Sequence, residues 1–112
     1  MSDANDAQMR KGLVSLSVLA VLAQEEAYGY AIVQQLERRR GLEFKESTIY
    51  LALGRLSKEG LVASRTVKSP SGPRRRYYQL TPQGKRHLLE LRERWLLLST
   101  AVSSLLAEVD DE

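Results

Sequence analysis

Residues 71–82 read Ser-Gly-Pro-Arg-Arg-Arg-Tyr-Tyr-Gln-Leu-Thr-Pro, and this stretch decides the fold. Ser-Gly-Pro favours a tight turn, because glycine tolerates a positive φ and proline fixes its own φ. Residues 77–80 are typical of a strand, and Thr81-Pro82 predicts a helix N-cap followed by proline at the first helical position. Three adjacent arginines at a turn cannot be buried, so they face water or an anion. We therefore expect a basic hairpin that leads directly into a helix.

Apolar periodicity on either side of this hairpin predicts three helices before it and one long helix after it. The first helix is apolar on two faces, which indicates burial on both. The expected helices cover residues 9–24, 28–39, 46–60 and 82–109, and the expected strands cover 61–68 and 76–80. Three helices followed by a hairpin form a winged helix-turn-helix. The predicted fold class is therefore mainly α with a small β-hairpin, plus a long C-terminal dimerisation helix. We expect residues 1–8 to be a disordered N-terminus, 9–81 the DNA-binding domain and 82–109 the dimerisation helix.

Charge is distributed unevenly along the 112 residues, although the net charge is only +3. Residues 28–86 hold 13 Lys and Arg against 4 Asp and Glu, whereas residues 1–27 and 87–112 are both net acidic. A strongly basic middle between acidic ends is typical of a nucleic-acid-binding module. The alternative is a solvated basic surface, which the concentration of charge in one continuous segment disfavours.

Several other function classes find no support in the sequence. The chain has no cysteine, which excludes disulfides and thiolate metal sites. No segment is typical of a signal peptide or a membrane span, so we expect a cytoplasmic protein. The single histidine, His87, has no nucleophile or carboxylate pattern around it, and no phosphate-loop or dinucleotide fingerprint occurs. We therefore expect neither an enzyme nor a cofactor or metal.

The order of short motifs resembles the PadR family of bacterial transcriptional regulators, from about Met9 to Leu106. The short C-terminus is similar to the smaller subfamily, which has one dimerisation helix and no further domain. Two positions depart from the family pattern, which often has glycine at Ser47 and proline at Leu51. The motifs that carry the resemblance are Lys11-Gly12, Tyr28-Gly29-Tyr30, Ser47-Thr48-Ile49-Tyr50, Arg55-Leu56, Glu59-Gly60-Leu61-Val62, Gly72-Pro73 with residues 74–78, and residues 80–84, Leu-Thr-Pro-Gln-Gly.

The expected fold assigns DNA contacts to the third helix, which would enter the major groove. Ile49 and Leu53 lie on its inner face. Ser47 and Tyr50 can bind DNA, although Ser47 could instead cap the helix and Tyr50 could pack against the second helix. Along this helix the positions left outside or on the flanks are Ser47, Thr48, Tyr50, Leu51, Gly54, Arg55 and Lys58.

The hairpin is expected to add cationic contacts to DNA, because guanidinium groups bind phosphates bidentately. Alternate strand residues face opposite ways, so not all three arginines can contact DNA. The resemblance implies that Tyr28 lies near the DNA backbone, whereas packing is favoured for Tyr30. For residues 38–40, three further arginines, we favour interaction with the helix dipole. The candidate DNA-binding residues are Tyr28, Ser47, Thr48, Tyr50, Arg55, Lys58, Lys68, Arg74, Arg75 and Arg76.

The last helix carries apolar residues spaced by three and four over three heptads, the pattern of a coiled-coil seam. A helix of roughly 40 Å cannot cover this seam with one small domain, so we expect a homodimer. The alternative is that the helix packs only against the first helix of its own chain. The candidate dimerisation residues are Leu16, Leu88, Leu91, Trp95, Leu98, Val102 and Leu105.

Trp95 is the only tryptophan and lies in the middle of the seam. Resemblance to multidrug-sensing members implies that paired Trp95 rings could bind a small planar aromatic effector. The alternative is that Trp95 only fills the dimer core.

Together these observations predict a homodimeric, sequence-specific DNA-binding transcriptional regulator. We expect a ligand-responsive repressor that binds a pseudo-palindromic operator. The alternative is a winged-helix module that binds another protein and does not read DNA.

Overall fold

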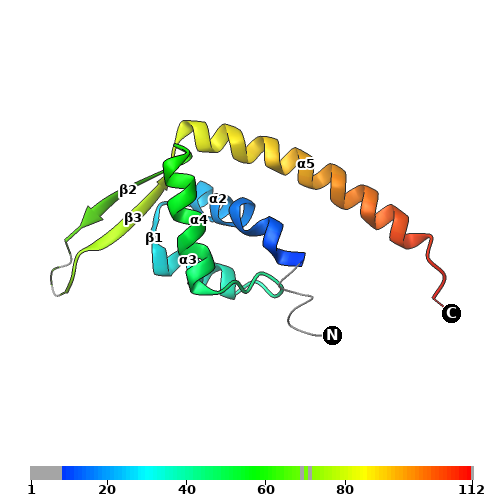
Figure 1. Cartoon of the computed structure of the whole chain (residues 1–112), viewed down its shortest axis with the longest axis horizontal. Coiled ribbons are helices and arrows are strands. Elements are labelled where there is room, and N and C mark those ends of the chain that lie inside the picture. The colour runs from blue at the N-terminus through cyan, green and yellow to red at the C-terminus, as the bar shows by residue number, and fades with distance from the viewer. Residues whose placement is uncertain (1–8, 69, 71, 112) are drawn as a thin grey trace.

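The computed structural model describes residues 9–68, 70 and 72–111. A group of helices lies at the centre, a hairpin projects to one side and a long helix projects to the other (Figure 1). The expected disordered segment 1–8, and Ser69 and Ser71 of the expected turn, lie outside the described residues. The elements are η1 (Lys11–Leu13), α2 (Val14–Gln24), β1 (Ala27–Tyr28), α3 (Gly29–Glu37), α4 (Glu46–Lys58), β2 (Val62–Val67), β3 (Arg75–Leu80) and α5 (Pro82–Ala107).

The core is formed where α2, α3 and α4 pack together and against the base of the hairpin. Each helix contributes residues spaced by three or four, so that one stripe of each is buried. α2 contributes the most complete stripe, and Val18 and Leu19 have no exposed surface. The other core residues from these elements are Val14, Leu22, Ile32, Val33, Leu36, Ile49, Ala52, Leu53, Leu56, Leu61, Val62 and Tyr78.

The sheet has three antiparallel strands in the order β1-β3-β2, one strand more than the sequence predicts. In the hairpin, Val62 pairs with Leu80 and Val67 pairs with Arg75. β1 adds only two residues, and Tyr28 pairs with Tyr77. Two residues are too few to show the alternation that identifies a strand, which is why β1 was not predicted. Because β1 immediately precedes α3, it ties the start of α3 to the hairpin.

A hydrogen-bonded joint connects the end of α4, the start of β2 and the start of α5. The Thr81 hydroxyl donates to the Gly60 carbonyl at 2.8 Å and accepts from the Gly84 amide at 2.9 Å, as expected for an N-cap. A Cβ on Gly84 would overlap the Leu61 carbonyl oxygen, so only glycine permits this close crossing. The joint therefore fixes the direction in which α5 leaves the domain.

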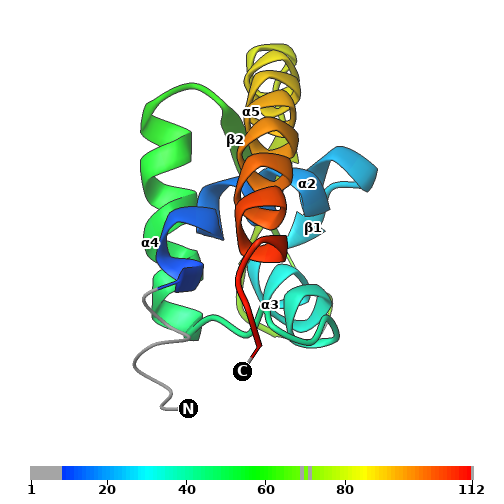
Figure 2. The ribbon, with the colours of Figure 1, turned by 90° about the vertical axis from the view of Figure 1, so that its right-hand side faces the viewer.

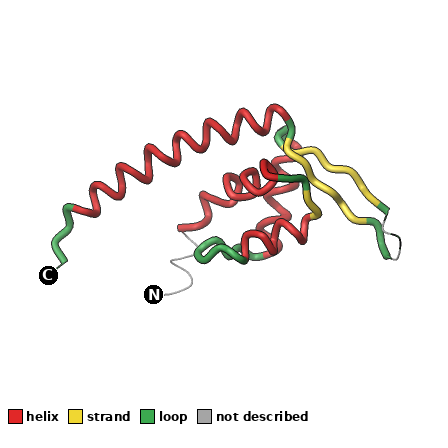
Figure 3. Tube along the Cα trace, turned by 180° about the vertical axis from the view of Figure 1, so that it is seen from behind, coloured by secondary structure: helices red, strands yellow, loops and turns green. Residues whose placement is uncertain are grey.

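α5 packs on the domain through its first turns and then extends beyond it (Figure 3). Leu88 is buried and Leu91 is half-buried against the core of the same chain. The assignment of Leu88 to the dimer seam is therefore wrong, and Leu91 has only part of its surface left for a partner. The reason is that the joint directs the first turns of α5 across α2. Among the described residues, no helix is both long enough and apolar enough to cross a membrane.

Candidate nucleic-acid interface

α4 lies at one side of the helical group and turns one face away from it (Figure 2). The buried stripe of α4 contains Ile49, Leu53 and Leu56. On the opposite side, an exposed line follows the same helical spacing and contains Ser47, Leu51, Gly54 and Lys58. We call these four residues the outer line of α4. No side chain caps the start of α4, so the interpretation of Ser47 as a helix cap is wrong.

A groove of about 330 Å³ lies between the N-terminus of α3, α4 and β3. Its lining brings together four tyrosines and two arginines from three separate parts of the sequence. A Cβ on Gly29 would overlap the Tyr50 ring, so glycine lets this ring pack against the start of α3. The lining residues are Tyr28, Gly29, Tyr30, Tyr50, Arg75, Arg76 and Tyr78. We call this the tyrosine groove.

Two phenols of the tyrosine groove, those of Tyr50 and Tyr78, are held in the protonated form. Partial burial raises the pKa of Tyr50 above its usual value, and the nearby Glu46 carboxylate raises it further. Burial also raises the pKa of Tyr78. A protonated phenol beside two guanidinium groups can donate to an anionic oxygen, so the groove suits a phosphate.

The hairpin arginines occupy different positions around the groove. Arg75 lies 5.9 Å from the Tyr28 ring centroid, measured from its guanidinium carbon. Arg76, the next residue of β3, also lines the groove and donates to the Ser64 hydroxyl at 3.5 Å. Arg74 and Lys68 are exposed at the loop end of the hairpin. In the described part of the chain, none of these four cations has a carboxylate within ion-pair distance.

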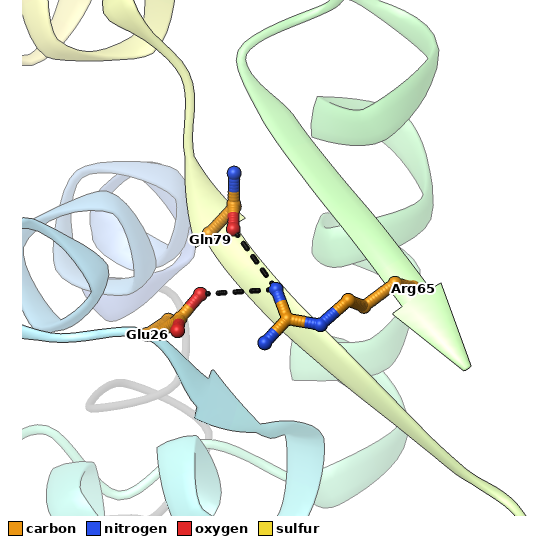
Figure 4. A network of polar contacts seen from close by, with 3 residues as sticks. All are labelled: Glu26, Arg65 and Gln79. Carbon is orange, nitrogen blue, oxygen red and sulfur yellow. Dashed lines mark hydrogen bonds and ion pairs between the residues drawn. The ribbon is translucent and has the colours of Figure 1, made fainter. Parts of the chain in front are cut away.

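Arg65 of β2 shows how a hairpin cation is held when the chain does provide partners. Its Nη1 lies 3.3 Å from Glu26 Oε2 and 3.2 Å from Gln79 Oε1 (Figure 4). Its guanidinium carbon also lies 4.8 Å from the centroid of the Tyr77 ring. Arg65 therefore braces β2 against β3 and the residues before β1, and its charge is offset within the chain.

Arg55 and Lys58 differ in their availability to DNA. The Arg55 guanidinium donates to the Ser15 hydroxyl on α2, although the side chain is still exposed. Arg55 thus lies on the flank of α4 that faces α2, away from the outer line. Lys58 is exposed at the last residue of α4. Thr48 is half-buried in the first turn.

Among the interface residues that were not candidates from the sequence, Tyr30 and Leu51 have large exposed side chains. Tyr30, for which packing was favoured from the sequence, is 55% exposed and lines the tyrosine groove, so part of its side chain is open to a ligand. Leu51 is 76% exposed on the outer line. The helical pattern did place Leu51 outside, but an apolar residue carries no obvious signal for DNA contact. Within the described residues, no cluster of three or more His, Cys, Asp or Glu could hold a metal ion.

The fold and this interface define a winged helix-turn-helix protein with a long C-terminal helix. The model of the transcriptional regulator PadR-like family matches residues 18–90. A curated relative, the transcriptional regulator Rv3488 of Mycobacterium tuberculosis, is 33% identical over 74% of this chain and 76% of its own. The chain belongs to the PadR-like family.

Solved structures of family members have the same fold. A PadR-like transcriptional regulator from Bacillus cereus is 35% identical with a TM-score of 0.79, over 92% of this chain and 99% of its own. A PadR-like transcription factor from Bacteroides fragilis is 37% identical with a TM-score of 0.75, over the same shares of the two chains. The predicted family and fold class are confirmed. The protein is a DNA-binding transcription regulator and not an enzyme.

Proposed function

We propose that the protein acts as a homodimeric, ligand-responsive repressor in the cytoplasm, where it occupies a pseudo-palindromic operator. The observation that carries DNA reading is the tyrosine groove beside the outer line of α4. It combines phenol donors with Arg75 and Arg76, whose charges have no carboxylate partner in the described part of the chain.

In the proposed complex, α4 enters the major groove and the hairpin follows the neighbouring backbone. Ser47 and Thr48 lie in the first turn of α4, where hydroxyls can reach base edges or phosphates. The tyrosine groove lies between α4 and the hairpin and would hold one backbone phosphate. Such contacts fix orientation, whereas the residues of α4 choose the sequence.

The exposed apolar stripe of α5 supports the dimer. Beyond Arg92, nearly every residue of α5 is exposed, including the large apolar side chains at the expected seam positions. Leaving such a stripe in water is unfavourable, and a second copy of the same helix covers it symmetrically. The seam residues that remain fully available are Trp95, Leu98, Val102 and Leu105. In such a dimer the two copies of α4 would lie about one DNA turn apart, roughly 34 Å.

Trp95 supports the response to a ligand, because it is large, aromatic and 44% exposed within this stripe. Paired Trp95 rings would offer flat faces to a planar aromatic effector. Titration of the purified dimer with such compounds, monitored by the fluorescence of this single tryptophan, tests the effector. Absence of quenching across the soluble range would remove effector binding from the proposal.

DNA reading is tested by the salt dependence of binding. A duplex selected in vitro from a random library serves as the operator. Arg75→Ala should weaken binding to all duplexes and reduce the slope of log K against log salt by about 0.9 for each phosphate that Arg75 neutralises. Arg39→Ala removes the same charge beyond the far end of α3 and should leave the slope unchanged. An equal effect of the two variants would show that only net charge matters.

Sequence choice is tested on α4 itself. Thr48→Ala and Tyr50→Ala should weaken binding to the selected duplex more than binding to random DNA, if their hydroxyls read bases. The alternative function, a winged module that binds another protein, predicts no enrichment of any duplex during selection. The basic middle segment and the tyrosine groove argue against that alternative.

A further inference from the structure

The outer line of α4 contains an apolar side chain where a polar one would be expected. Leu51 is 76% exposed and lies one turn after Ser47, at the centre of the surface proposed to meet DNA. A single exposed leucine is ordinary on a protein surface. Leu51 is distinguished by its position, because it follows the outward-facing first turn of α4.

Gly54 lies beside Leu51 on the outer line, and no contact within the described residues requires a glycine at this position. A Cβ at Gly54 would meet no atom within 4 Å, and the residue does not have a positive φ. Glycine in the interior of a helix lowers helix stability relative to alanine. Gly54 therefore lowers the stability of α4 without permitting any close contact. Gly29 and Gly84, in contrast, each allow another part of the chain to approach closely.

We propose that Leu51 reads the 5-methyl group of a thymine in the major groove, and that Gly54 leaves room beside it for the base-pair edge. Thymine is the base that presents an apolar group there, so an exposed leucine can distinguish it from the other bases. This proposal rests on the proposed function, because it requires α4 to enter the major groove. It deepens that function by assigning apolar readout to a position between the hydroxyl groups of the first turn and Lys58.

The test uses the selected duplex and replaces each thymine in turn by deoxyuridine, which keeps base pairing and removes only the methyl group. Each duplex carries a single replacement. For the full-length protein, replacement at one position of either half-site should weaken binding about fourfold, as expected for removing one buried methyl group. For Leu51→Ala the same replacement should have no effect.

Equal reductions for both proteins, or a selected duplex without thymine in its half-sites, would overturn the proposal and leave DNA reading intact. Failure to select any duplex would overturn both, which distinguishes the two failures.

Gly54→Ala gives a second, independent measurement. The variant should unfold at a higher temperature, because alanine favours the helix, and yet bind the selected duplex at least threefold more weakly. Ser57→Ala is the matched control, since it also raises helix propensity in α4 but lies off the outer line. It should leave affinity within twofold. If Gly54→Ala also leaves affinity within twofold, the role of Gly54 is refuted.

Discussion

The DNA-binding domain and the distal half of α5 are rich in the same types of apolar residue, but only the domain buries them. In the domain, leucines such as Leu19 and Leu53 have no exposed surface. In α5, Leu97 is 72% exposed and Leu105 is 65% exposed, although the helix continues without a break. The domain buries its apolar side chains within one chain, whereas distal α5 leaves its own exposed to solvent. This difference supports the proposal that a second copy of the chain covers distal α5.

The largest effect is expected when a charge is placed in the exposed apolar stripe of α5. Leu98→Glu should raise the dimer dissociation constant at least 100-fold, because the carboxylate would have to be desolvated at the seam. The domain should remain folded, since its core does not include Leu98. Analytical ultracentrifugation measures the association, and circular dichroism checks the fold. Thr100→Glu adds the same charge on the other side of α5 and should leave the dimer intact. If the Leu98→Glu protein is still a dimer, Leu98 does not lie in the dimer interface.

A second large effect is expected in the buried core of the domain. Leu53→Ala should lower the free energy of unfolding by about 2–5 kcal/mol, because it removes buried methyl groups and leaves a cavity. The measurement is urea denaturation in the monomeric Leu98→Glu background, so that dimerisation does not contribute. In that background Leu105→Ala should change the free energy by less than about 0.5 kcal/mol. Similar reductions for the two leucines would mean that distal α5 is buried within its own chain.

The joint between the two regions should contribute about 1 kcal/mol. Thr81→Ala removes both the cap of α5 and the hydrogen bond to the Gly60 carbonyl, so the free energy of unfolding should fall by that amount. Thermal or urea unfolding of the same monomeric background measures it. Thr100→Ala removes an exposed hydroxyl of α5 and serves as the control. If both variants behave alike, the cap does not stabilise the joint.

The smallest effect is expected for the ion pair that braces the hairpin. Glu26→Gln should change the free energy of unfolding by less than about 0.5 kcal/mol, because the side chains of Arg65 and Glu26 are 56% and 40% exposed and water screens their charges. Denaturation at low and high salt measures the change. A decrease above about 1 kcal/mol would show that the Arg65 contacts act as a cooperative network.

Local patterns in the sequence predicted most of the domain, because helices and hairpins follow from spacing and turn residues. The start of α5 at Pro82 and the range of α4 were predicted closely. β1 could not be predicted, since a two-residue strand exists only because β3 lies beside it. The seam position of Leu88 was wrong for a related reason. Heptad spacing shows that a residue is apolar, but only tertiary packing decides whether its own chain or a partner covers it.

The candidate interface was predicted less completely than the fold. Arg75, Arg76, Tyr28 and Tyr50 were candidates from the sequence, but their grouping into one groove depends on how α3, α4 and β3 meet. Arg55 illustrates the limit, because its hydrogen-bond partner Ser15 is 40 residues away in the chain. Long side chains on the flank of a helix can turn to either side, and sequence spacing does not determine which.

The Thr81 joint couples the orientation of α5 to that of α4, the helix proposed to enter the major groove. Because α4, β2 and α5 are locked together by Thr81, Gly84 and the backbone of Leu61, a rotation of α5 carries α4 with it. In the proposed dimer, a tilt of about 5° over a length of about 40 Å displaces the domain end of α5 by about 3.5 Å. That distance is close to the rise of one base pair. A small change of packing between the two copies of α5 would therefore shift the two reading helices by one base-pair step relative to each other.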